Sequence, residues 1–182
     1  MSKFVDKLQS LSKSSTTPIG FHPAVSELKS PAMLLIAGLS GTQVKEAKIV
    51  ADVNADAGLI LSEGVSAKVV KQMVEAVGDV PLGVFVKGMN EEKLNEVTSV
   101  GCDFVVFDIR TPAAVLHKEG VGKFLMIEPS LDHGLVRAIN SLEVDGVLIS
   151  GRGGDPFVAV EHLLVCRRFV ELLEKPVIMA LP

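Results

Sequence analysis

Along most of the chain, short apolar runs alternate with longer stretches in which apolar residues recur every three or four positions. The short runs begin near positions 33, 57, 81, 103, 123, 145 and 175. They are almost continuously aliphatic, as in parallel strands that are covered on both faces. The stretches between them have helical spacing, so the pattern predicts seven β-strands that alternate with α-helices. Such alternation implies right-handed crossovers and a parallel sheet.

The N-terminal region has a different pattern. Helical spacing there is seen in four apolar residues, Phe4, Val5, Leu8 and Leu11. They predict a short amphipathic helix over residues 2–12, and a connector rich in serine and proline follows it. We therefore expect a helix and connector over residues 1–30 and one α/β domain over residues 31–182.

Residues that cap helices precede several of the helical stretches. Ser40 with Gln43 fits a capping box, and Asn90 precedes two glutamates. Thr111 and Asp155 each precede a proline, which is favoured at the first helical position. A helix is therefore predicted after each of these residues, and the last of them is expected to begin at the proline that follows Asp155.

The residues that introduce the apolar runs follow a two-step rhythm. An aspartate introduces the runs at 57, 103 and 145, whereas a proline introduces the first, third and seventh runs. This rhythm resembles that of (βα)8 barrels, or TIM barrels, of the flavin-binding and phosphate-binding kind. That group includes nitronate monooxygenases, inosine monophosphate dehydrogenases, phosphoribosylanthranilate isomerases and barrel proteins without an assigned reaction. The resemblance covers residues 31–182 and implies an α/β fold with a parallel barrel.

A complete barrel of this kind has eight strands, one more than the pattern supplies. The chain ends on the seventh run, so we expect an incomplete barrel of about seven strands, truncated before the eighth. An open doubly wound sheet is the alternative, but its GxGxxG loop is not matched by "IAGLSGTQ" after the first run. Exposed sheet edges recruit partners, so self-association through these edges is expected.

Charged residues lie where four successive apolar runs end, which is where barrels carry their functional groups. They are Glu63, Lys87, Asp108 and Glu128. Side-chain alternation places all four on the inward face, so they are expected around one mouth. Carboxylates in unequal surroundings can divide acid and base roles, and a desolvated lysine can act as a nucleophile. The alternative is that each charge meets solvent or pairs with a neighbour.

A glycine-rich stretch follows the sixth run and predicts an anion site. Gly151, Gly153 and Gly154 allow backbone conformations in which successive N–H groups form a concave nest. Arg152 adds a positive charge, and the helix that follows adds its N-terminal dipole. Phosphate or a carboxylate would suit this loop. Asp155 would compete for the same donors, and a plain connector is the alternative.

Composition narrows the classes of partner. The formal net charge is −4, from 18 basic and 22 acidic residues without basic runs, which argues against nucleic acid. No membrane-spanning segment is expected, because about 18 consecutive apolar residues would be needed. Cys102 and Cys166 form no CxxC pair, which fits a cytoplasmic protein. The acidic residues at the strand ends lack histidine and metal-binding spacing, so no metal is predicted.

Three functions remain open on these observations. The first is a lyase or isomerase that acts on a small phosphorylated or carboxylated molecule at the mouth. The second is an oxidoreductase that binds FMN, a cofactor implied by the resemblance alone. The third is a non-catalytic barrel that binds a ligand or a partner chain.

Overall fold

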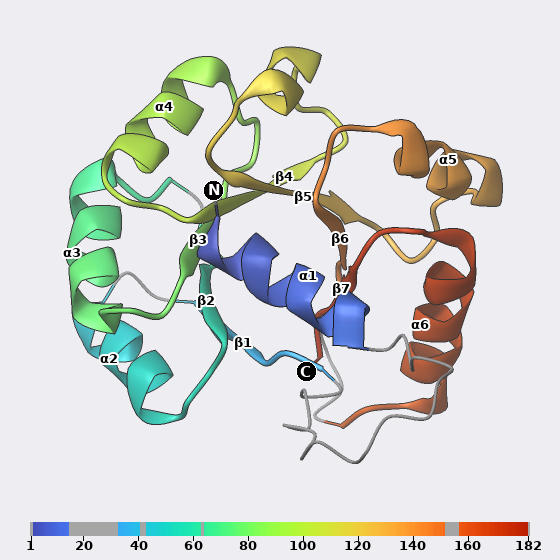
Figure 1. The fold of residues 1–182 in the computed structure, drawn as a ribbon, viewed down its shortest axis with the longest axis horizontal. Coiled ribbons are helices and arrows are strands. Elements are labelled where there is room, and N and C mark those ends of the chain that lie inside the picture. The colour runs from blue at the N-terminus through green and yellow to red at the C-terminus, as the bar shows by residue number, and fades with distance from the viewer. Residues whose placement is uncertain (1, 15–32, 41–42, 63, 152–156, 182) are drawn as a thin grey trace, which may run out of the picture.

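The computed structural model describes residues 2–14, 33–40, 43–62, 64–151 and 157–181. Seven parallel strands form one sheet in which each strand pairs with its neighbours in sequence. The strands are β1 (Ile36–Leu39), β2 (Ala57–Ile60), β3 (Leu82–Phe85), β4 (Phe104–Asp108), β5 (Gly122–Ile127), β6 (Gly146–Ile149) and β7 (Val177–Met179). The sheet curls into an open barrel with helices around its outside (Figure 1). The predicted barrel-type fold is confirmed, because a doubly wound sheet would reverse its strand order.

Helices connect the strands and cover the outer face of the sheet (Figure 1). They are α2 (Val44–Asp52), α3 (Ala67–Val77), α4 (Glu91–Ser99), the 3₁₀ helix η1 (Ala113–His117), α5 (His133–Ala138), the 3₁₀ helix η2 (Ile139–Ser141) and α6 (Val160–Leu172). The predicted N-terminal helix is α1 (Lys3–Ser14). A membrane-crossing helix needs about 20 apolar residues, and none of the helices in the described ranges meets that requirement.

The helix starts agree only in part with the caps predicted from sequence. Asn90 does cap α4, because its side-chain oxygen accepts a hydrogen bond from the backbone N–H of Lys93 at 2.9 Å. The cap predicted at Ser40 is wrong, because α2 begins at Val44. The backbone is still extended at Gln43, which is the N-cap residue and makes no side-chain capping bond.

The helix predicted to begin at Pro156 also starts later. Asp155 and Pro156 lie outside the described residues, but the helix itself begins at Val160. The backbone of Ala159 is extended, and its N–H donates to Nδ1 of His162 at 3.0 Å. The His162 imidazole therefore accepts a hydrogen bond at this helix start, where the sequence pattern predicts an aspartate as the cap.

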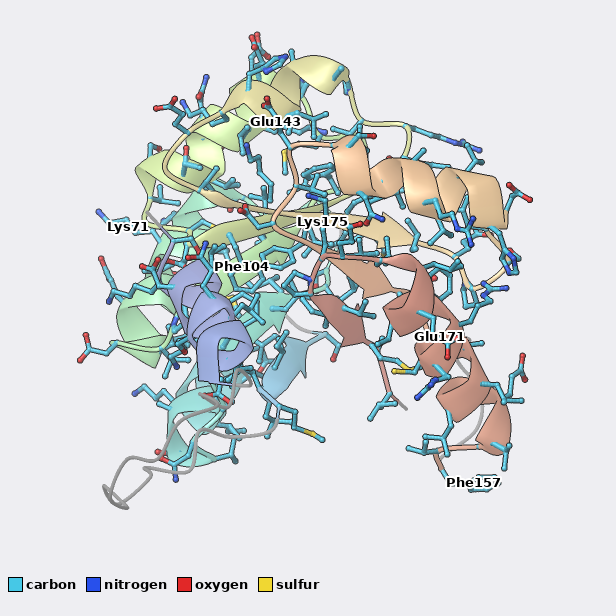
Figure 2. The ribbon with its side chains drawn as sticks, turned by 45° about the vertical axis from the view of Figure 1, so that its right-hand side comes forward. Lys71, Phe104, Glu143, Phe157, Glu171 and Lys175 are labelled. Carbon is cyan, nitrogen blue, oxygen red and sulfur yellow. The ribbon has the colours of Figure 1, made fainter. Side chains whose placement is uncertain are left out.

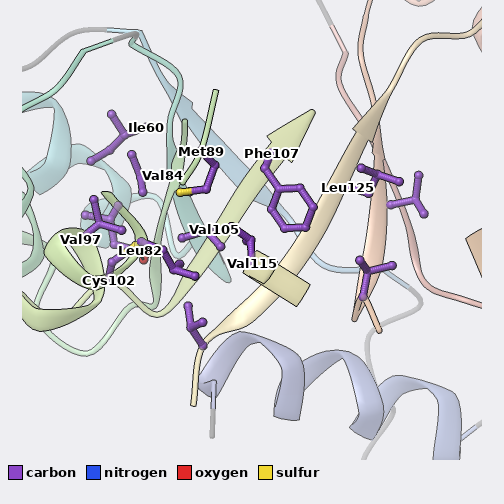
Figure 3. Packing of buried hydrophobic residues seen from close by; sticks show 14 of the residues in the cluster. Ile60, Leu82, Val84, Met89, Val97, Cys102, Val105, Phe107, Val115 and Leu125 are labelled. Carbon is purple, nitrogen blue, oxygen red and sulfur yellow. Dashed lines mark hydrogen bonds between the residues drawn. The ribbon is translucent and has the colours of Figure 1, made fainter. Parts of the chain in front are cut away.

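Side chains alternate between two apolar clusters along the strands. The outward-facing cluster lies between the sheet and the helices, and Figure 3 shows part of it, including Ile60, Val84, Val105, Phe107 and Leu125. The inward-facing cluster fills the barrel and comprises Phe4, Val5, Ala57, Leu59, Phe104, Val106, Phe124 and Leu148. The second set includes residues of α1, and this helix lies across the amino end of the barrel rather than in the outer ring of helices (Figure 1).

The interior depends on aromatic rings that lie beside glycines. The two strand neighbours of Phe104 in the register of the sheet are Gly83 and Gly122. A Cβ atom on Gly83 would lie 2.2 Å from the Phe104 ring, and one on Gly122 would lie 2.9 Å from the Phe104 Cβ. Gly83 therefore provides the space that the ring occupies, and Gly122 provides space at the base of the same side chain. Phe124 is in the same situation beside Gly146, whose Cβ would lie 2.8 Å from that ring.

Helix α1 closes this aromatic cluster. The ring centroid of Phe4 is 4.7 Å from that of Phe104 and 5.5 Å from that of Phe124. Phe104 and Phe124 are themselves 5.5 Å apart in an edge-to-face arrangement. Figure 2 shows Phe104 beside the helix. Such aromatic pairs contribute about 0.5–1.5 kcal/mol each beyond the burial of apolar area.

The aspartate that precedes β4 holds the first turn of α1. The carboxylate of Asp103 accepts hydrogen bonds from the Ser2 hydroxyl at 2.7 Å, the Lys3 N–H at 2.8 Å and the Phe4 N–H at 3.0 Å. Free N–H groups at a helix start favour an acceptor and a negative charge. Lys7 adds a second link, because its ammonium group donates to the carbonyl of Asp56 at 2.9 Å.

The two-step aspartate rhythm thus has a structural explanation. Asp56 and Asp145 directly precede β2 and β6, as Asp103 precedes β4. The Asp56 carboxylate accepts from the N–H of Leu35 at 2.9 Å, and that of Asp145 accepts from the N–H of Lys123 at 2.8 Å. Each of these two carboxylates therefore binds the start of the preceding strand.

Replacing Asp103 by alanine should loosen α1 selectively. We expect the free energy of unfolding to fall by about 1–3 kcal/mol, because the first-turn N–H groups lose their acceptor. Hydrogen exchange at the α1 amides should accelerate more than exchange in the sheet. Asp145→Ala is the matched control, since that carboxylate precedes a strand in the same way but accepts from Lys123 and contacts no residue of α1 in the described part of the chain. Unchanged α1 protection in Asp103→Ala would contradict this account.

Replacing Gly83 by alanine should destabilise the barrel because the new methyl group overlaps the Phe104 ring. Overpacking of this kind costs about 1–3 kcal/mol, and the ring is held between Phe4 and Phe124. A second change, Phe104→Leu, should relieve the overlap. Chemical denaturation of both single variants and the double variant forms a cycle, in which the double variant should lose less stability than the sum. Additive losses would show that the glycine and the ring are not coupled.

Candidate site at the carboxyl ends of the strands

Three of the four predicted strand-end charges lie at the same end of the barrel. Asp108 is the last residue of β4, Glu128 directly follows β5, and Lys87 lies in a turn two residues after β3. Parallel strands bring these positions together, as expected for the functional end of a barrel. Lys87 and Glu128 are exposed, whereas Asp108 is half-buried. Glu63 lies outside the described residues.

The two carboxylates are staggered along the barrel axis. In the register of the sheet, Asp108 lies opposite Met126, which lies opposite Leu148. Glu128 is two residues beyond Met126 and therefore about 6.6 Å further along the strand direction, at about 3.3 Å per residue. Asp108 thus borders the apolar interior, while Glu128 stands above it in solvent.

The side chain of Asp108 also shapes the turn that follows β4. Its Oδ1 atom accepts from the Arg110 N–H at 2.9 Å and from the Thr111 hydroxyl at 3.5 Å. Thr111 therefore bonds backward to the strand end and does not cap the helix predicted after it; Pro112 is the N-cap residue of η1. The carboxylate is held in place by this turn, and its catalytic role stays a prediction.

Glu128 begins a loop that is fastened to α6. The Ser130 hydroxyl donates to the Glu128 carboxylate at 3.4 Å. Arg168 of α6 donates from its guanidinium group to the carbonyl of Pro129. Among the described residues, the Arg168 Nε atom is the buried side-chain nitrogen or oxygen without a hydrogen-bond partner. Arg168 therefore anchors the loop that carries Glu128.

A cavity of about 340 Å³ lies at the end of β3, between the segment that leads into α3 and the first two turns of α4. Lys87 and Lys93 line it, together with Ser66 and Glu96. Ser66 is the N-cap residue of α3, but its hydroxyl makes no capping hydrogen bond. Gly64, which also lines the cavity, has a positive φ of 72° that favours glycine.

The arrangement in this cavity suits an anion. Two lysines and the N-terminal end of α3 contribute positive potential, and Glu96 contributes one negative charge. The predicted ring of charges is therefore divided, since Lys87 lines the cavity whereas Asp108 and Glu128 do not. Sequence reasoning missed Ser66 and Lys93. The signals available were a glycine and a serine between a strand and a helix, and a lysine in the first turn after a capping asparagine.

The predicted anion loop after β6 is mostly outside the described residues. Arg152, Gly153 and Gly154 fall there, so anion binding at this loop stays a prediction. Gly151 is described and exposed. A Cβ atom on it would lie 3.0 Å from the carbonyl oxygen of Ala180, so this glycine allows the chain to pass close to the end of β7.

Cys102 is buried on the helix-covered side of the sheet, where Figure 3 labels it. Burial raises the pKa of its thiol to about 12; hydrogen bonding to the Phe104 carbonyl opposes this shift, and the neighbouring Asp103 carboxylate adds to it. The thiolate is the reactive form, so Cys102 is unsuited to nucleophilic catalysis. Within the described ranges, no cluster of three histidine, cysteine or acidic residues could hold a metal.

Comparison with known proteins bears on the fold. No protein-family model and no curated protein sequence matches the chain. A solved structure of the tryptophan synthase alpha-subunit from the hyperthermophile Pyrococcus furiosus has a TM-score of 0.66 and 14% identity, covering 81% of this chain and 77% of that chain. The fold is TIM-barrel-like. A structure of the tryptophan synthase a2b2 complex from the same organism gives a TM-score of 0.62 at 14% identity over the same shares.

The burial of Cys102 predicts a large difference in reactivity between the two thiols of the barrel. Cys166 is half-exposed on α6, so a disulfide reagent such as DTNB should modify one thiol in the native protein and two after unfolding. Cys166→Ser should leave the native protein almost unreactive. A fast native reaction in that variant would show that Cys102 is accessible.

The raised Cys102 pKa also predicts a loss of stability at alkaline pH. The folded state keeps the thiol protonated, so this contribution is fully present below the ordinary pKa of 9.0 and is lost as the pH rises toward about 12. Cys102→Ala removes the titrating group, and its stability should fall less steeply over this range. Parallel pH curves for the two proteins would exclude the linkage.

Proposed function

We propose that the protein binds a small molecule with a phosphate or carboxylate group at the carboxyl end of β3. The observation that carries the proposal is the cavity in which Lys87 and Lys93 lie beside the N-cap residue of α3. Phosphate groups bind where lysine charges and helix N-terminal N–H groups converge. The volume of about 340 Å³ is in the range of small-ligand sites.

The first turn of α3 supports an anionic ligand because it carries no acidic residue. The positive end of the helix dipole is therefore not offset by a neighbouring side chain of that turn. The Ser66 hydroxyl makes no capping bond to the helix, which leaves it able to contact a ligand. Glu96 places one negative charge in the lining and works against anion binding.

Acid–base chemistry at the same mouth is the second part of the proposal. Asp108 is half-buried beside apolar residues, whereas Glu128 is exposed. Unequal surroundings are what two carboxylates need in order to divide acid and base roles. With Lys87 as the electrostatic group, and Glu63 at the preceding strand end, this set suits a lyase or isomerase. The fold likeness to a tryptophan synthase alpha-subunit is compatible with such a reaction.

Substitution of the cavity lysines tests the binding site. In calorimetric titrations with inorganic phosphate and phenyl phosphate, Lys87→Ala and Lys93→Ala should each weaken binding about tenfold, equal to about 1.4 kcal/mol. Glu96→Gln should strengthen binding, because it removes the negative charge from the cavity. Lys71→Ala is the matched control, since this exposed lysine lies on α3 but does not line the cavity.

The outcomes separate the candidate sites and functions. Equal affinities in all variants would overturn the cavity proposal. Loss of binding only in Arg152→Ala would assign the anion to the glycine-rich loop after β6. Saturable phosphate binding without turnover of any phosphorylated compound would favour a non-catalytic barrel. Flavin absorbance in the purified protein would favour the FMN-binding alternative.

A further inference from the structure

The outer layer of helices leaves a cleft over β4 and β5. Along the chain, consecutive helices of this layer pack on each other, α2 on α3, α3 on α4, α4 on η1, and α5 on α6. Between η1 and α5 a cleft takes the place of such packing, among the described elements. The helix between β4 and β5, η1, has five residues, whereas α3 has 11 and α6 has 13. The short helix therefore leaves part of the sheet uncovered.

The cleft has a volume of about 320 Å³ and an apolar lining. Phe107 and Leu125 lie opposite each other in the register of β4 and β5 and line it from the outer face of the sheet (Figure 3). Helix η1 contributes Leu116 from one side, and α5 and η2 contribute Ala138 and Ile139 from the other. Apolar cavities of about 150 Å³ bind benzene, so this cleft has room for a ring that carries a short chain.

Both walls of the cleft are fastened to elements behind them. On the η1 side, the Lys118 ammonium group donates to the side-chain oxygen of Asn95 in α4 at 2.7 Å. On the other side, the Asn140 amide donates to the carbonyl of Leu172 at 3.1 Å and accepts from the N–H of Glu174 at 3.0 Å. These bonds tie η1 to α4 and η2 to the end of α6. The cleft is therefore preformed, which lowers the ordering cost of binding.

One ionisable side chain, that of Asp108, is found among the described residues that line the cleft. Its Oδ1 atom accepts the two hydrogen bonds that hold the turn after β4, from the N–H of Arg110 and the hydroxyl of Thr111. The Oδ2 atom accepts no hydrogen bond in the described part of the chain. The Arg110 side chain is exposed and does not line the cleft. An apolar cleft with one carboxylate oxygen left for a donor therefore lies at this end of the barrel.

We propose that the cleft binds a small amine with one apolar ring, whose ammonium group donates to Oδ2 of Asp108 while the ring lies between η1 and α5. Charge complementarity selects this class of ligand, because a carboxylate attracts a cation and repels an anion. Hydrogen bonds between charged groups are roughly twice as strong as neutral ones, so an amine is favoured over an alcohol of the same shape.

Exposed apolar residues surround the opening of the cleft. Ile109, Leu135 and Leu142 line it and are 65%, 58% and 39% exposed. Exposed apolar surface gathered around a concave site is typical of ligand binding. The ring of the amine would remove part of this surface from water, and that burial supplies the apolar share of the binding free energy.

This site is distinct from the anion site proposed at β3. No described residue lines both the β3 cavity and the cleft, so amine binding does not rest on anion binding. Asp108 is shared with the proposed acid–base pair, and a bound amine would occupy its carboxylate. Phosphate titration of each variant below shows whether the β3 site is intact, so the failure of one proposal is distinguishable from the failure of the other.

A series of three ligands of similar shape tests the chemistry. In titrations followed by methyl NMR, 2-phenylethylamine should bind about tenfold more tightly than 2-phenylethanol, because its donor is charged. The anion 3-phenylpropanoate should show no saturable binding. The methyl signals of Ile109, Leu135 and Leu142 should shift on addition of the amine. Those of Leu163 and Leu164, which are exposed on α6, should not shift.

Two substitutions separate the carboxylate from the apolar cleft. Asp108→Asn should weaken binding of 2-phenylethylamine about tenfold and leave 2-phenylethanol unchanged, because the amide keeps an oxygen for the turn but loses the charge. Ala138→Phe should abolish binding of both compounds by filling the cleft. Glu119→Gln and Ala114→Phe are the matched controls, since both residues are exposed and neither lines the cleft.

Several outcomes would overturn the proposal. Equal affinity for the amine, the alcohol and the anion would show that Asp108 does not select the ligand. Undiminished binding in Ala138→Phe, or equal methyl shifts on α6, would place the compounds elsewhere. Methyl shifts at Leu135 that depend on protein concentration and do not respond to the amine would assign the cleft to a second copy of the chain. Circular dichroism should show the same helix content in all variants.

Discussion

The fit of two phenylalanine rings beside glycines is the constraint on which the rest of the barrel depends. Phe104 needs the space above Gly83 and Gly122, and Phe124 needs the space above Gly146. In a chain with no tryptophan or tyrosine, these rings supply the bulk that fills the curl of the sheet. Protein interiors tolerate few voids, so the small and large residues of neighbouring strands must match.

The packing of these rings determines which end of the barrel is open to a functional site. Helix α1 contributes Phe4 to the cluster and is held at its first turn by Asp103, directly before β4. The amino end of the barrel is therefore occupied by protein. The carboxyl end has Asp108, Glu128 and the β3 cavity, and the described loop residues there do not belong to the aromatic cluster.

The regular part of the fold could be predicted from the sequence because it follows local patterns. Aliphatic runs and helical spacing identified all seven described strands and the N-terminal helix. The barrel type came from the resemblance of the two-step rhythm to that of known barrels. Interactions between distant residues could not be predicted. Asp103 was recognised as part of a rhythm, but its bonds to Ser2 join positions 101 residues apart. The predicted start of α2 was wrong because the backbone at Gln43 is still extended. The residue types of the Ser40 motif do not reveal this conformation.

The candidate site was predictable to a smaller extent, for a physical reason. Strand ends can be recognised in a sequence, so Lys87 and Asp108 were identified and both lie at the carboxyl end of the barrel. Cavities form between elements, and Lys93 and Ser66 reach theirs from two helices whose relative placement no local pattern encodes. Alternation along a strand predicts which face of the sheet a side chain is on, but not its position along the barrel axis. The stagger between Asp108 and Glu128 could therefore be seen only in the register of β4 and β5.

The position of α1 has a consequence for the order of folding. The partners of this helix are the start of β4 and a ring in β5, so it cannot dock until the chain as far as β5 has been made. An isolated helix of 12 residues is marginal in water, and closing so long a loop adds an entropic cost. The place of the N-terminal helix in the barrel interior therefore depends on strands that are synthesised after it.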